Sequence, residues 1–167
     1  MSRRWPLGLA LAAVLACAAK CPPPAAAPAA SGGKPAVYFV NSAGPAWPVR
    51  AAAAEWAAVA TKVAVRYGPC PRPKPADVKC RLVREGTGLS DTNIGATTLL
   101  THNVRFNPDY AGLPYPQRLA ATCHELGHAL GVEHNDAADS CMNPEIGQGT
   151  STRPGKRDVA RLNGPGS

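Results

Sequence analysis

The sequence predicts one α+β domain with α/β-like layers, and three observations support this class. The chain has 167 residues, of which 45% are hydrophobic, which is enough for one buried core and too little for two. Five short runs rich in β-branched and aromatic residues indicate a sheet of about five strands. One helical segment lies among these strands and two more follow them, which is the pattern of a layered α+β or α/β fold.

The chain is expected to begin with an export signal. Arg3 and Arg4 precede an uncharged apolar run over residues 5–19. This run is too short to span a bilayer and has the layout of a secretory signal peptide. Small residues would allow cleavage after Ala18 or as late as Ala29. We therefore expect a secreted, extracellular protein.

The segment after this signal is expected to be a linker or a short pro-segment. Residues 20–35 are rich in proline and alanine and cannot build a core. Residues 14–17 loosely resemble a lipoprotein box, so a lipid anchor on Cys17 is a minor alternative. We expect the leader and linker to occupy residues 1–30 and the folded domain to occupy residues 31–167.

The charge of the chain is basic but dispersed. Formal net charge is +7, and Arg3, Arg4 and Lys20 belong to the leader region, which leaves 15 basic against 11 acidic residues, or +4. These charges form no run and alternate with no aromatic repeat. Nucleic acid is therefore not an expected partner, and no stable membrane span is expected either.

The first three elements are expected to form a strand, helix, strand unit. A β-branched and aromatic run over residues 37–40 predicts a buried strand. An alanine-rich segment over residues 49–61, with Pro48 near its first turn, predicts a long helix. Residues 63–67 predict a second strand. Because a helix connects them, the two strands are expected to pair in parallel.

The remaining strands follow a proline-rich loop bounded by Cys70 and Cys80. They are expected at residues 81–84, 93–100 and 103–107. A last helix is expected over residues 154–162, where apolar residues could pack inward. The middle helix lies between these two groups and carries the residues that suggest a chemistry.

That helix contains His-Glu-Leu-Gly-His-Ala-Leu-Gly-Val-Glu-His, residues 124–134. Apolar residues recur in this region at intervals of three and four, at Leu119, Cys123, Leu126 and Leu130. This periodicity predicts a helix with one apolar face. On such a helix His124 and His128 lie one turn apart on the same face, where both can reach one metal ion.

The continuation of the motif favours a catalytic metal. Gly131 comes where the helix must end so that the chain can turn back and bring His134 to the metal. Three neutral imidazoles leave one open position on a tetrahedral Zn²⁺. Glu125 is not needed as a ligand and could act as general base toward a water on the metal, whose pKa the metal lowers toward about 7. This is the metalloprotease arrangement.

A second motif lies eight residues beyond His134. Met142 is found in Ser-Cys-Met-Asn-Pro, residues 140–144, a tight turn that would form the floor beneath the metal. The histidine motif followed by this turn resembles the metzincin clan of zinc endopeptidases, and its spacing and Pro144 resemble the matrixin branch. We assign Met142 to packing, because a thioether is poorly suited to a histidine ligand set.

The resemblance covers roughly residues 36–163. It implies a small metzincin-type domain with a twisted mixed sheet, and an enzyme that hydrolyses peptide bonds in polypeptide substrates. Its site would hold one catalytic Zn²⁺ on His124, His128 and His134, with Glu125 as catalytic residue. We expect a monomer. The sequence does not decide whether structural calcium binds, or which substrate side chains are preferred.

Two features depart from the matrixin pattern. Only about three dozen residues precede the first strand, so the usual propeptide cysteine that blocks the zinc is not expected. The acidic pair of the last helix is replaced by Arg157 and Asp158. Only the contact that supports the methionine turn is therefore expected to remain.

The resemblance also suggests a substrate-binding edge. The strand near residues 95–100 would bound the active-site cleft, and an unpaired edge can accept an extended peptide by strand addition. The candidates for binding substrate are Ala96, Thr97, Thr98 and Leu99. An ordinary protected edge is the alternative. The segment after the turn, residues 145–152, would form a pocket wall, and His102 is expected to be a surface or packing residue.

Four cysteines lie in the domain, at Cys70, Cys80, Cys123 and Cys141. An even count in an exported protein predicts two disulfides, for which three pairings are possible. We favour Cys70 with Cys80, which closes a short loop, and Cys123 with Cys141, which would join the metal helix to the methionine turn. Cys123 is not expected to be a ligand, because it projects about 100° around the helix from His124.

Two other functions stay open from the sequence. The domain could be a secreted metal-binding or adhesion module that has kept the fold and lost turnover. It could also be a different zinc hydrolase, such as an aminopeptidase or an amidohydrolase.

Overall fold

The computed structural model describes residues 33–165. The expected signal, its cleavage sites and Cys17 lie outside the described residues. Within them the strands are β1 (Ala36–Asn41), β2 (Ala64–Tyr67), β3 (Val78–Glu85), β4 (Gly95–Thr97) and β5 (Val104–Phe106). The helices are α1 (Val49–Val59), α2 (Tyr115–Ala129) and α3 (Lys156–Leu162), with a 3-10 turn, η1, at Pro108–Tyr110.

The five strands form one mixed sheet in the order β2-β1-β3-β5-β4. β1 pairs in parallel with both β2 and β3, and β3 pairs in parallel with β5. β4 alone runs antiparallel, beside β5, and so forms one edge of the sheet. The predicted α+β class, with a mixed sheet of about five strands and three helices, is confirmed, as is the parallel pairing of the first two strands.

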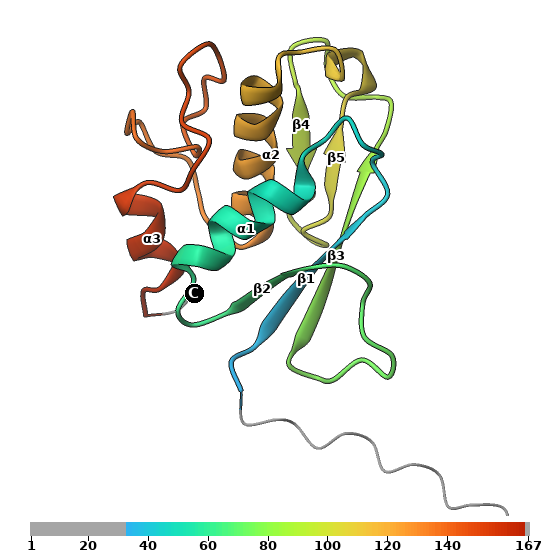
Figure 1. Cartoon of the computed structure of the whole chain (residues 1–167), viewed down its shortest axis with the longest axis vertical. Helices are drawn as coiled ribbons and strands as arrows, with labels where there is room; N and C mark the ends of the chain where they lie inside the picture. Colours follow the sequence, from blue (N-terminus) through green and yellow to red (C-terminus); the bar gives the residue numbers. More distant parts are fainter. Residues whose placement is uncertain (1–32, 166–167) are drawn as a thin grey trace, which may run out of the picture.

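The helices gather on one side of the sheet, where α1 crosses α2 and α3 lies at the C-terminal end of α1 (Figure 1). Buried residues from both layers form a single core. Its largest members are Trp47, Trp56, Phe39, Phe106, Leu126 and Met142. The indole N–H of Trp56 donates to the carbonyl oxygen of Cys123 at 2.9 Å, so α1 fixes α2 through a buried polar contact as well as through packing.

Several element boundaries differ from the expected ones. β3 begins at Val78, because its pairing with β1 extends over six residues, whereas the sequence suggested a start at residue 81. α1 ends at Val59 and α3 begins at Lys156, each two residues inside the expected helix. These shifts leave the order and type of every element unchanged.

The strand expected over residues 93–100 was too long. β4 ends at Thr97, and the amide of Thr98 donates to the carbonyl oxygen of Asn103, which closes a turn. Thr98 and Leu99 therefore lie in the turn and not on the strand. His102, between β4 and β5, has a φ of 52°, a left-handed backbone conformation.

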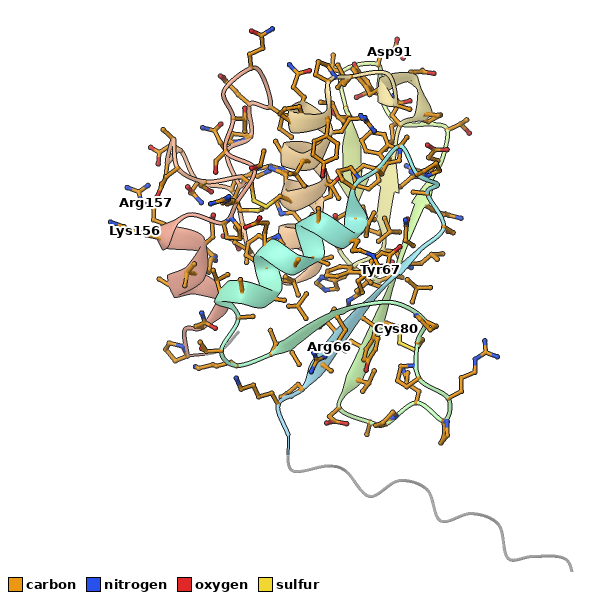
Figure 2. All side chains as sticks on the ribbon, viewed as in Figure 1. Arg66, Tyr67, Cys80, Asp91, Lys156 and Arg157 are labelled. Carbon is orange, nitrogen blue, oxygen red and sulfur yellow. A yellow bond between two sulfur atoms is a disulfide. The ribbon has the colours of Figure 1, made fainter. Side chains whose placement is uncertain are left out.

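Both favoured disulfides are present. Cys70 and Cys80 join the proline-rich loop to β3, with 5.8 Å between their Cα atoms, and Cys80 is labelled in Figure 2. Cys123 and Cys141 join α2 to the segment that follows it, with 6.0 Å between their Cα atoms. Within residues 33–165, no helix is long and apolar enough to cross a membrane.

Candidate metal centre and cleft

Three histidine side chains converge at the end of α2. His124 and His128 lie one turn apart on this helix, and Gly131, with a φ of 89°, turns the chain so that His134 returns to them. Their Nε2 atoms are 3.1 Å apart for His124 and His128, and 3.0 Å apart for each of the two pairs with His134. The sequence spacing therefore predicted correctly that these rings come together.

Main-chain carbonyls orient two of the three rings. Nδ1 of His124 lies 2.9 Å from the carbonyl oxygen of Cys141, and Nδ1 of His128 lies 2.9 Å from that of Val132. A carbonyl oxygen only accepts hydrogen bonds, so each Nδ1 carries the proton and each Nε2 presents a lone pair. Lone pairs that point at the same place repel one another, and a cation at that place would make the arrangement favourable.

The donor set fits zinc. Three imidazole nitrogens are typical of a catalytic zinc site, and Zn–N distances of about 2.0–2.1 Å in a tetrahedron imply N···N separations of roughly 3.3–3.4 Å. The observed separations of 3.0–3.1 Å are close to that value. Among the described residues, these histidines are the group of three or more His, Cys, Asp or Glu side chains that could hold one metal ion.

Burial keeps the ligand candidates neutral. Burial, together with the smaller effect of the neighbouring His128, lowers the pKa of His124 to about 4. Burial also lowers the pKa of His128 below its ordinary value. Both rings are therefore neutral near pH 7, which is the form that binds a metal. His124 is buried, His128 half-buried and His134 exposed, so the group opens toward solvent on one side.

Glu125 follows His124 on α2 and is also buried. Burial raises the pKa of its carboxyl group to about 7, and a hydrogen bond from Thr97 opposes that rise. The Thr97 hydroxyl lies 2.7 Å from Oε2 of Glu125 and 2.9 Å from its main-chain oxygen. No local sequence pattern predicts this contact, because the two residues are 28 positions apart and belong to different elements.

Met142 lies beneath the site and is fully buried. It packs against Gly127, the residue before His128. A Cβ atom on Gly127 would lie 2.3 Å from the sulfur of Met142 and 2.6 Å from the ring of Trp56. Only glycine leaves this space, so α2, the methionine turn and α1 meet at one point.

A buried polar network supports the methionine turn from below. The amide of Met142 donates to Oγ of Ser140 at 2.8 Å, and that hydroxyl donates to Asp158 at 2.6 Å. Asn135, next to His134, donates to the other carboxylate oxygen of Asp158 at 2.5 Å. Asp158 is therefore the expected support of the turn. Arg157 instead pairs with Asp136 at the surface and points away from the network (Figure 2).

A cleft of about 640 Å³ opens over the histidines. Its walls are β4 with the residues before it on one side, and the histidine segment with Pro144 and Ile146 on the other. Of the four candidates for substrate binding, Ala96, Thr97 and Leu99 line the cleft, whereas Thr98 is not among the lining residues. His102 also lines the cleft and does not belong to the metal-binding group.

Comparisons with known proteins show the fold. No family model matches the chain, and no curated protein matches it in sequence. The solved structure of a zinc-dependent peptidase from Methanocorpusculum labreanum is similar, with a TM-score of 0.50 and 17% sequence identity. The match covers 77% of this chain and 100% of that one. At this identity the likeness establishes a shared architecture.

Proposed function

We propose that this protein is a zinc-dependent endopeptidase of the metzincin type, closest in its motifs to the matrixin branch. One observation carries the proposal: three imidazole Nε2 atoms lie 3.0–3.1 Å apart at the base of an open cleft, which Glu125 also lines. The shared fold with a zinc-dependent peptidase supports it. Fold alone does not imply function, so the argument depends on the site.

His124, His128 and His134 would hold the zinc. When bound there, zinc supplies a Lewis acid that makes water nucleophilic near neutral pH and polarises the scissile carbonyl. Glu125 takes the proton from the attacking water and later delivers it to the leaving amine. Burial raises the pKa of Glu125 above its ordinary value, which favours both steps, because a group that accepts and then donates a proton works best when its pKa is near the working pH.

The substrate would be a polypeptide in extended conformation. β4 pairs with β5 on one side only, so its other side can receive a peptide strand along the cleft. β4 has only three residues, which limits the number of main-chain hydrogen bonds to the peptide. Side-chain contacts with the cleft walls would therefore contribute a large share of the binding.

We further propose that the protein works outside the cytoplasm as a monomer. Its two disulfides are typical of oxidising compartments, and the apolar run near the N-terminus has the layout of an export signal. The matrixin assignment draws support from the Met142 spacing, from Pro144 in the cleft wall and from the Asp158 network beneath the turn.

The test compares wild-type protein with Glu125→Gln on a denatured protein and on peptides blocked at both termini. We expect internal cleavage by the wild type, a decrease of roughly 10²–10⁴-fold in the variant, and one zinc per chain in both. Glu55→Gln makes the same change on α1, where Glu55 pairs with Arg153, and is the matched control.

Three results would contradict the proposal. Cleavage at the wild-type rate by Glu125→Gln would remove Glu125 from the mechanism. Cutting that requires a free terminus would indicate an aminopeptidase. Full zinc content in a wild-type protein that hydrolyses none of these substrates would indicate a metal-binding module without turnover.

A further inference from the structure

We propose that β4 positions the general base, with Thr97 as a positioning residue that acts through Glu125. The inference rests on the proposed function and assigns to this strand a role beyond binding substrate. Side chains alternate along a strand, so Gly95 and Thr97 face the same side while Ala96 faces the other. That shared side is the one against which the side chain of Glu125 lies.

The hydroxyl of Thr97 is within hydrogen-bond distance of two oxygens of Glu125 and shares its one proton between them. The hydroxyl oxygen lies 2.7 Å from the carboxyl oxygen Oε2 and 2.9 Å from the main-chain oxygen of Glu125. An ionised carboxylate only accepts hydrogen bonds, so the hydroxyl is the donor toward it. Because the main-chain oxygen belongs to α2, one hydroxyl fixes the carboxyl group relative to the helix that also carries His124 and His128.

Among the described residues, no second donor forms a hydrogen bond to the carboxyl group of Glu125, so Thr97 is its only donor. The side chain is also almost fully buried. A buried carboxylate that loses its donor is free to turn toward other groups and bears the full cost of desolvation. The orientation of Glu125 therefore depends on one residue of an edge strand.

Gly95 provides the space that this orientation needs. A Cβ atom there would lie 2.8 Å from Cγ of Glu125 and 3.0 Å from the ring of Phe106. Phe106 is buried and stacks on Trp47, with 4.2 Å between ring centroids, so it cannot move aside. Any larger residue at this position would displace Glu125. Gly95 and Thr97 thus define the place of the carboxyl group from two neighbouring positions.

The main test is Thr97→Val, which keeps the shape of the side chain and removes the hydroxyl. We expect kcat to fall roughly 10–100-fold, the loss typical of a hydrogen bond to a charged group, while KM changes less than about 2-fold. Zinc content is expected to stay at one per chain. Thr97→Ser, which restores the hydroxyl, is expected to recover kcat to within about 3-fold of the wild type.

Thr101→Val is the matched control. It removes a hydroxyl from the exposed turn after β4, where the oxygen only accepts a long contact of 3.4 Å from the amide of Asn103. Gly95→Ala is the second probe and is expected to lower kcat with full zinc content, because it displaces the same carboxyl group. If Thr97→Val does not fold, Thr97→Ala takes its place with the same expected result.

The outcomes separate this inference from the proposed function. Wild-type kcat in Thr97→Val, or equal damage in Thr97→Ser, would overturn the positioning role. A rise in KM with unchanged kcat would also overturn it, since it would place Thr97 in substrate binding. A wild-type protein that contains zinc and cleaves none of the substrates would overturn both proposals together.

Discussion

The two walls of the cleft are built differently. The histidine wall is anchored by the Cys123–Cys141 disulfide, the buried Asp158 network and the packing of Met142 on Gly127. The β4 wall is a three-residue edge strand that continues into a turn where Leu99 is 88% and Leu100 94% exposed. One wall is held by a disulfide and by buried contacts from several elements, and the other is held by pairing with β5 and by the contacts of Gly95 and Thr97 with Glu125.

This difference assigns separate tasks to the two walls. Metal binding requires three nitrogens at fixed separations, and the histidine wall supplies them. Substrate must enter and leave along the other wall, so a short and exposed strand suits it. Glu125 lies where the two meet: α2 carries its backbone and β4 orients its carboxyl group. The walls can therefore be perturbed one at a time.

The largest expected effect comes from removing the disulfide of the histidine wall. Replacing Cys123 and Cys141 by Ala opens a loop with a sequence separation of 18 residues, and we expect the free energy of unfolding to fall by about 3 kcal/mol. Zinc affinity should also decrease, because the carbonyl oxygen of Cys141 orients His124. Denaturant unfolding and zinc titration measure the two effects.

The matched control is the pair Cys70 and Cys80, whose loop has a separation of 10 residues and lies away from the metal site. Replacing this pair by Ala should lower stability to a similar degree and leave zinc affinity unchanged. Equal losses of zinc affinity in the two double variants would show that the Cys123–Cys141 disulfide has no specific role in positioning the metal ligands.

The next effect concerns pH in the metal-free protein. The pKa of His124 is about 4 when folded and 6.5 when unfolded, so its neutral ring destabilises the fold as pH falls through 6.5. The pKa of Glu125 is about 7 when folded and 4.5 when unfolded, so its protonation stabilises the fold as pH falls through 7. In the wild type the two contributions oppose each other.

Removing one contribution exposes the other. In Glu125→Gln without metal, we expect stability to decrease by about 2 kcal/mol between pH 7 and pH 5, whereas the wild type should change much less. Chemical denaturation of chelator-treated protein across this range measures the difference. Curves with the same slope for the two proteins would show that burial does not shift these groups as described.

The smallest effect is expected on the β4 wall. Leu99→Ser should raise KM about 3-fold without changing stability, because Leu99 lines the cleft and is otherwise exposed. Leu100→Ser is the control, since Leu100 is equally exposed and is not a lining residue. Kinetics on one blocked peptide decide the matter, and an equal rise in KM for both variants would contradict a specific contact by Leu99.

The sequence predicted the histidine wall better than it predicted the β4 wall. Helical spacing placed His124 and His128 together, and a glycine after the helix indicated the return of His134. Both are local patterns. The Cys123–Cys141 pair and the parallel pairing of β1 with β2 also agree with expectation. Histidines at this spacing, a glycine after a helix and paired cysteines each have few structural roles, so their positions could be predicted from the sequence.

The β4 wall was predicted less well because its contacts are long-range. A run of apolar and polar residues suggested a strand up to residue 100. The turn instead begins after Thr97, where the carbonyl oxygen of Asn103 accepts a hydrogen bond from the amide of Thr98. The role of Gly95 was missed, since nothing in its neighbours shows that Glu125 will occupy the space beside it. Thr97 was a candidate for binding substrate, and the contact of its hydroxyl with Glu125 was not predicted.

Zinc X-ray absorption spectroscopy of the purified protein tests the central claim most directly. Three imidazole nitrogens from His124, His128 and His134 should give a shell of light atoms at about 2.0–2.1 Å, with outer-shell scattering from three rings and no sulfur. A sulfur shell at about 2.3 Å, or scattering from fewer than three imidazoles, would contradict the claim that these residues form the metal site.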